Sequence, residues 1–164
     1  MLKKFEFIFE KFGPILLSIV VFIFLIHYKK YFSFHFSPQG GWKIDALYNA
    51  IFGWSSVQVG FVFGVYGFVI GKKDGFIEAV KNTVAMRRFN SYLRSANILG
   101  FLLAVTSLPL MVINPDISTD HNFIYYVVSL WFSAFTWAFL TFLRISVTFG
   151  ILISVKDEND FDGA

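Results

Sequence analysis

Long apolar stretches separated by short polar segments dominate this chain. A helix needs about 20 mostly apolar residues to cross roughly 30 Å of hydrocarbon. Four stretches fit this requirement, over residues 12–28, 46–71, 95–113 and 123–145. The fourth remains apolar as far as Val155, interrupted by Arg144. The pattern therefore predicts an all-α membrane protein, in which residues 1–164 form a single domain of four transmembrane helices.

The composition of the chain agrees with this interpretation. Of the 164 residues, 56% are hydrophobic and 15% are charged, whereas a soluble domain is about 45–50% apolar and about 25% charged. The mean hydropathy is +0.63, which favours a bilayer. These values exclude a nucleotide-binding fold, a disulfide scaffold and a soluble enzyme with a membrane tail. Because there is no cysteine, thiol redox catalysis, iron–sulfur clusters and thiolate zinc sites are excluded as well.

The first apolar stretch has one feature of a signal peptide, because two lysines precede it. Two glutamates also lie in this leader, and the stretch ends in His27-Tyr28-Lys29-Lys30 instead of small residues. An uncleaved signal-anchor helix is therefore the better interpretation. Pro14 is expected either to start this helix or to kink it away from an interfacial segment over residues 5–12.

Basic residues in the loops predict how the spans are oriented. With four spans, 11 of the 14 lysines and arginines fall on one side of the membrane and three on the other. This excess predicts an N-in/C-in topology, with both termini cytoplasmic. The net charge of +3 then reflects orientation, and no direct contact with nucleic acid is expected.

The second loop, residues 72–94, is predicted to contain a cytoplasmic amphipathic helix. Between residues 76 and 93, apolar side chains recur every three or four positions. Its basic residues are Lys81, Arg87, Arg88 and Arg94. They could bind anionic membrane lipids, bind a cytoplasmic sensor protein, or simply belong to a positively charged connector. The last segment, residues 156–164, is expected to be a frayed acidic tail.

The second span carries a stripe of small and polar residues. On a helix of about 100° per residue, its five glycines fall within one narrow wedge, with an asparagine and a serine at the border. Because glycine lowers helix stability, five glycines on one face indicate that this face has a role that requires small residues. Either another helix packs closely there, or the bare backbone lines a narrow water-filled path. The stripe comprises Asn49, Gly53, Ser56, Gly60, Gly64, Gly67 and Gly71.

The fourth span carries a second stripe, made of Ser129, Ser133 and Thr136, with Arg144 at its edge. Hydroxyl groups in a span often bond to their own backbone. If the span ends near Leu143, the guanidinium snorkels to the inner headgroups. If the helix continues, the charge needs a partner or water, or forms a cationic ring at the mouth of an oligomeric pore. The small residues of the third span, including Gly100, are typical of ordinary helix packing.

Two function classes remain after the chemistry is considered. The three histidines match no metal motif, so neither a metal nor a cofactor is expected, and the chain is not predicted to be an enzyme. Acidic residues are missing from the interiors of the four spans, which argues against proton-coupled transport. The first class is a homo-oligomeric ion-conducting pore. The second is a non-conducting membrane adaptor that recruits a cytoplasmic partner through the basic loop.

The layout resembles the RexB family of phage-exclusion proteins and similar membrane effectors of abortive anti-phage systems. The shared features are short spans, inside termini, a basic second loop, and two local strings. These are His27-Tyr28 followed by Ser33-Phe34, and Phe68-Val69-Ile70-Gly71 before basic residues. The first loop is longer here, and the glycine stripe is not part of the resemblance. The resemblance implies an ion-conducting inner-membrane effector of antiviral defence, which a cytoplasmic sensor triggers during phage infection.

Overall fold

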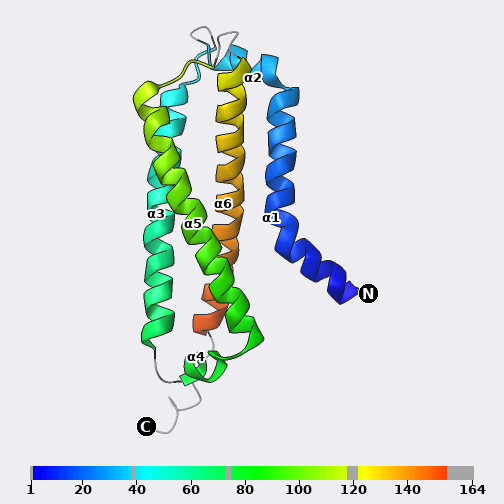
Figure 1. The fold of residues 1–164 in the computed structure, drawn as a ribbon, viewed down its shortest axis with the longest axis vertical. Coiled ribbons are helices and arrows are strands. Elements are labelled where there is room, and N and C mark those ends of the chain that lie inside the picture. Colours follow the sequence, from blue (N-terminus) through cyan, green and yellow to red (C-terminus); the bar gives the residue numbers. More distant parts are fainter. Residues whose placement is uncertain (1, 38–39, 73–74, 118–121, 155–164) are drawn as a thin grey trace.

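The computed structural model describes residues 2–37, 40–72, 75–117 and 122–154, and all regular structure in these ranges is helical (Figure 1). The helices are α1 (Leu2–His27), α2 (Lys29–His35), α3 (Ile44–Gly71), α4 (Gly75–Val80), α5 (Val84–Ile113) and α6 (Asn122–Ser154). Helix α5 packs against α3 and α6, and α1 packs against α6. Short α2 and α4 lie at opposite ends of the bundle, here named the α2 end and the α4 end (Figure 1).

Three helices, α3, α5 and α6, are long and apolar enough to cross a membrane. The segments Phe12–His27 and Lys29–His35 meet the same requirement only as a pair, which is bent by 75°. The all-α architecture is therefore confirmed, and the helix lengths support a membrane location. A fourth span depends on the bent pair.

Helix α1 is also bent within its own length. Pro14 lies inside it, and the N-terminal part points away from the bundle (Figure 1). A proline in a helix interior removes one backbone hydrogen bond and clashes with the preceding turn, which kinks the helix. This is the kink that the Gly13-Pro14 pair predicts.

The segment before α5 differs from the single amphipathic helix expected over residues 76–93. Helix α4 ends at Val80, and α5 begins at Val84. The break lies at Thr83, which has extended backbone and whose Oγ1 accepts a hydrogen bond from the Met86 N–H at 3.3 Å. A threonine in this position satisfies an N–H that has no partner inside the helix, so it starts a new helix. The third span is consequently the continuation of a helix that begins ten residues before Arg94.

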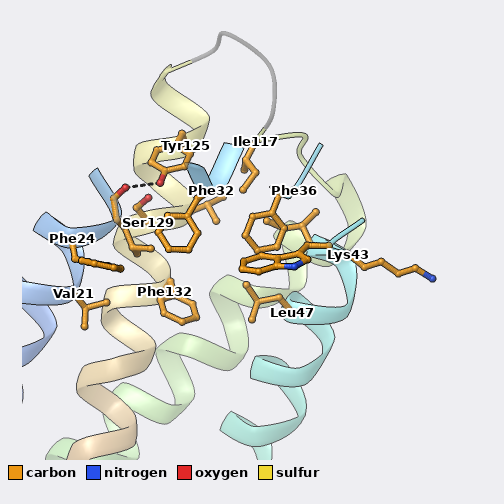
Figure 2. Close-up of a pocket in the computed structure, with 14 residues that line it drawn as sticks. Val21, Phe24, Phe32, Phe36, Lys43, Leu47, Ile117, Tyr125, Ser129 and Phe132 are labelled. Carbon is orange, nitrogen blue, oxygen red and sulfur yellow. Dashed lines mark hydrogen bonds between the residues drawn. The ribbon is translucent and has the colours of Figure 1, made fainter. Parts of the chain in front are cut away.

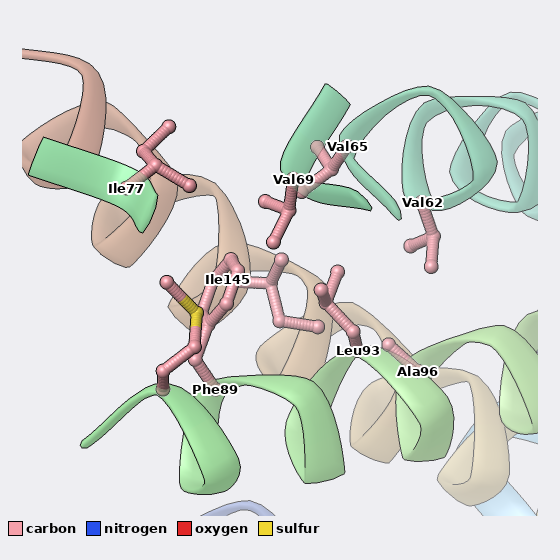
Figure 3. Close-up of a cluster of buried hydrophobic side chains, with 9 residues drawn as sticks. Val62, Val65, Val69, Ile77, Phe89, Leu93, Ala96 and Ile145 are labelled. Atoms are coloured by element: carbon pink, nitrogen blue, oxygen red, sulfur yellow. The ribbon is translucent and has the colours of Figure 1, made fainter. Parts of the chain in front are cut away.

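Two clusters of buried side chains hold the bundle together. The cluster at the α4 end joins valines of α3 to Met86, Phe89, Leu93 and Ala96 of α5, and it also takes in one isoleucine each from α4 and α6 (Figure 3). The cluster at the α2 end is richer in aromatic residues and joins α3, α5 and α6 with the loop after α5. Ile117 of that loop is 4% exposed, and Asn114 begins the loop in the left-handed conformation, φ 43°. Asparagine tolerates this conformation better than most residues.

An aromatic seam fills the space between α3 and α6. Trp54, Phe61 and Phe68 are spaced seven residues apart, which places them on one side of α3. The Trp54 ring lies 5.2 Å from that of Phe135, and the Phe61 ring lies 5.2 Å from that of Phe142. These edge-to-face pairs have favourable geometry. The rings thus occupy the space between the two helices.

Candidate functional site

The predicted stripe on α3, here named the glycine face, points away from the other helices. All five glycines are exposed, and a Cβ added to any of them would meet no heavy atom within 4 Å. Asn49 and Ser56 are exposed as well, and each donates a hydrogen bond to its own helix, to Asp45 O at 2.9 Å and Phe52 O at 3.0 Å. No other helix of the described chain therefore packs on this face. It is open to lipid, water or a second molecule.

The stripe on α6 lies on the inside of the bundle. Ser129 and Ser133 are buried, and Thr136 is half-buried. The Ser133 hydroxyl donates to the Ser129 carbonyl oxygen at 2.8 Å, and the Thr136 hydroxyl donates to the Phe132 carbonyl oxygen at 3.2 Å. These two hydroxyls thus bond to their own helix, which is the simpler of the two interpretations of such residues.

The structure does not bring the two stripes together in one chain. The glycine face is exposed, whereas the α6 hydroxyls are buried, and the aromatic seam occupies the space between the two helices. A water-filled path that uses the glycine face would have to run between two copies of the chain.

Arg144 makes a specific contact near the α4 end. Its guanidinium carbon lies 3.6 Å from the centre of the Tyr92 ring of α5. Helix α6 continues past Leu143 to Ser154, and Tyr92 is an aromatic partner for the charge within this helix. A guanidinium stacked on an aromatic face contributes about 0.5–2 kcal/mol, depending on how far it is desolvated.

The basic residues of the second loop lie around the start of α5. Lys81 lies in the connection between α4 and α5, and Arg87, Arg88 and Arg94 are exposed on the first turns of α5. The buried residues of these turns, among them Phe89, face the α4-end cluster (Figure 3). The segment therefore has the expected amphipathic character, although part of it belongs to a long helix.

Sequence reasoning missed Gln58, the most deeply buried amide of α3. It is 1% exposed, and its Nε2 donates to the Ala96 carbonyl oxygen of α5 at 2.8 Å, while its Oε1 has no partner. The signal was present, because Gln58 lies in the middle of an apolar span. On a helical projection Gln58 falls opposite the glycine face, so it does not belong to the stripe of small and polar residues predicted on α3.

A cavity of about 720 Å³ lies at the α2 end, between α1, α2, α3 and α6 (Figure 2). Its walls are mainly apolar, and Ser129 is the predicted site residue that contributes to them. The Tyr125 hydroxyl donates to the Leu25 carbonyl oxygen at 2.6 Å, while the Lys43 side chain points outward (Figure 2). The cavity can hold an apolar group such as an acyl chain. Sequence patterns could not reveal it, because four separate segments form it.

Within the described ranges, no group of three or more His, Cys, Asp or Glu residues could hold a metal ion. One ring nitrogen of His35 lies 2.8 Å from the Tyr31 carbonyl oxygen. His121 and the predicted acidic tail, residues 156–164, lie outside the described residues.

Comparison with known proteins returns no family model, no curated protein and no solved structure that matches this chain.

Proposed function

We propose that this chain is a membrane effector that assembles through the glycine face of α3 and conducts ions along a path between its copies. The observation that carries the proposal is the exposed glycine face, from Gly53 to Gly71, with nothing within 4 Å of any added Cβ. In membranes, helices associate by close packing of small residues. A face that lowers helix stability and contacts nothing else in the described chain is explained by contact with a second copy.

The path is placed between copies because side chains occupy the space between α3 and α6 within one chain. Aromatic rings occupy the space between α3 and α6, and two apolar clusters occupy the ends of the bundle. Between copies, the glycine face offers backbone carbonyl groups together with the side chains of Asn49 and Ser56. Exposed backbone and small polar groups are the usual lining of narrow membrane pores.

The proposed biological role follows the resemblance to phage-exclusion effectors. In this proposal, the α4 end faces the cytoplasm of a bacterium, and the pore in the inner membrane stays closed until a cytoplasmic sensor acts at that end. Opening depolarises the membrane and stops growth of an infected cell. Exposed Arg87, Arg88 and Arg94 at the α4 end suit contact with an acidic sensor.

Assembly and conduction are tested separately. Because the chain has no cysteine, a Gly64→Cys variant reports contact between glycine faces by disulfide cross-linking in membranes. We expect cross-linked dimers. A Gly150→Cys variant is the matched control, because Gly150 of α6 is also exposed and also has no heavy atom within 4 Å of an added Cβ. Equal cross-linking at both positions would refute assembly through α3.

Conduction is measured with a voltage-sensitive dye in cells that express the chain from an inducible promoter. Strong expression of the wild type is expected to depolarise the cells without the sensor, because a minority of the pores is open at equilibrium. Gly60→Leu/Gly64→Leu is expected to reduce this response at least about tenfold, because two leucines would block close approach. Gly150→Leu should behave as wild type. An unchanged response in the double variant, with normal insertion, would remove the glycine face from the mechanism.

The second candidate is the non-conducting adaptor, which the exposed arginines at the start of α5 favour. An adaptor would lose partner binding when Arg87 and Arg88 are replaced by glutamine. It would tolerate Gly60→Leu/Gly64→Leu, and it would leave the membrane potential unchanged. The two substitution sets therefore distinguish the candidates.

A further inference from the structure

A polar groove of about 560 Å³ lies between α3 and α5 near the α4 end. Arg87, Asn90, Arg94 and Asn97 line it from α5. Their spacing of three and four residues places all four on one side of that helix. Phe63 and Tyr66 line the opposite wall and are both exposed. The groove thus combines two cations, two amides and an aromatic wall.

The polar groups of the groove have hydrogen-bonding and charge capacity left over. Arg87 and Arg94 are exposed, and neither forms an ion pair with another described residue. Asn90 and Asn97 each bury a side-chain oxygen that has no hydrogen-bond partner. These two oxygens lie out of reach of a ligand, whereas the guanidinium groups of Arg87 and Arg94 line the groove. A ligand that carries negative charge would neutralise them.

The position of the groove along α5 matches the headgroup layer of a membrane. No charged residue occurs between Arg94 and the end of α5 at Ile113, a length of about 28 Å that equals the hydrocarbon thickness. With Ile113 at one edge of the hydrocarbon, Arg94 lies at the other edge and Arg87 lies about 10 Å further out. Lipid phosphates occupy this depth.

We propose that the groove binds phosphatidylglycerol, with its phosphate on Arg87 and Arg94 and its glycerol headgroup between the α5 side and the aromatic wall of the groove. Arginine binds phosphate through paired N–H donors, and basic pockets between spans are typical sites for anionic lipids. An acyl chain can then lie along Phe63. The proposal rests on α3 and α5 crossing the membrane, and it does not depend on conduction.

The test counts lipids retained by the full chain in native mass spectrometry, after reconstitution with equal amounts of phosphatidylglycerol and phosphatidylcholine. Wild type is expected to retain phosphatidylglycerol selectively. Arg87→Gln/Arg94→Gln should weaken retention by about tenfold or more, because charge-assisted bonds to the phosphate are lost. The matched control, Lys81→Gln/Arg88→Gln, removes two positive charges from the same end outside the groove. It should change retention less than about twofold.

Three results would overturn the proposal. Equal losses in both double variants would show a non-specific basic surface, and equal retention of the two lipids by wild type would show no site. Stabilisation of the protein against heat by inorganic phosphate alone, as strong as that by phosphatidylglycerol, would assign the groove to free phosphate. Resistance of every variant to carbonate extraction verifies insertion, so a failure here is distinct from a failure of the pore proposal.

Discussion

Two sides of α3 differ in how they use small side chains. The buried side consists of three valines, an isoleucine, a tyrosine, a serine and a glutamine, and it includes Val62 and Gln58. The opposite side consists largely of glycine, yet nothing in the described chain covers it. Close approach between α3 and α5 instead uses Gly100, on the partner helix. A Cβ there would lie 3.1 Å from both Gln58 Nε2 and Val59 Cγ2.

The comparison teaches that a glycine stripe identifies a smooth surface and does not identify what lies on it. Within a chain, two helices can pack tightly through β-branched side chains, and these residues lose less backbone entropy on folding than glycine does. Gly100 is needed because Gln58 reaches across to Ala96 and occupies the space a side chain would take. The exposed glycines have no such neighbour. These glycines can allow close packing only against a molecule outside the described chain.

The largest effect is expected from a leucine at the buried glycine. Gly100→Leu should destabilise the fold by about 3 kcal/mol, because the side chain overlaps Gln58 and Val59 and breaks the Gln58–Ala96 hydrogen bond. Gly64→Leu, which meets no atom within 4 Å, should leave the stability of the isolated chain unchanged or slightly raised. Thermal unfolding in detergent measures both. Equal destabilisation would contradict the distinction between the two sides of α3.

A matched pair of valines on α3 gives an intermediate effect. Val65 is 3% exposed and Val57 is 67% exposed. Val65→Ala should cost about 2 kcal/mol, because it leaves a cavity in the α4-end cluster, whereas Val57→Ala should cost almost nothing. Both are the same change on the same helix, so intrinsic helix propensity cancels. If Val57→Ala lowered the free energy of unfolding more in the oligomer than in the monomer, the surface between copies would include Val57 as well as the glycines.

The smallest effect is expected at the contact between Arg144 of α6 and Tyr92 of α5, which involves a single charged group. A double-mutant cycle of Arg144→Gln and Tyr92→Leu should give a coupling of about 1 kcal/mol. When Tyr92→Phe, which keeps the aromatic ring, replaces Tyr92→Leu in the cycle, the variant should retain most of the coupling energy with Arg144. A coupling near zero would mean that the arginine is held by other contacts, and that Tyr92 only covers it.

Much of the fold could be predicted from residue patterns. The all-α class, the apolar stretches of α3, α5 and α6, and the bend at Pro14 follow from local properties of the chain. The break at Thr83 was missed because its apolar spacing continues smoothly from α4 into α5, and only capping geometry reveals it. The glycine stripe was located correctly on one face of α3. The pattern left open what covers this face, because the spacing within one helix carries no information about what packs on it.

Residue composition is enough to predict helical, membrane-compatible segments, because in an apolar environment the backbone must satisfy its hydrogen bonds internally. Which faces of the helices meet depends on how they pack in the folded chain. The burial of Gln58, the seating of Arg144 on Tyr92, and the groove between α3 and α5 all join residues from separate segments. Helical periodicity defines a face, whereas the choice among faces depends on the shapes of the partners, and these exist only in the folded chain.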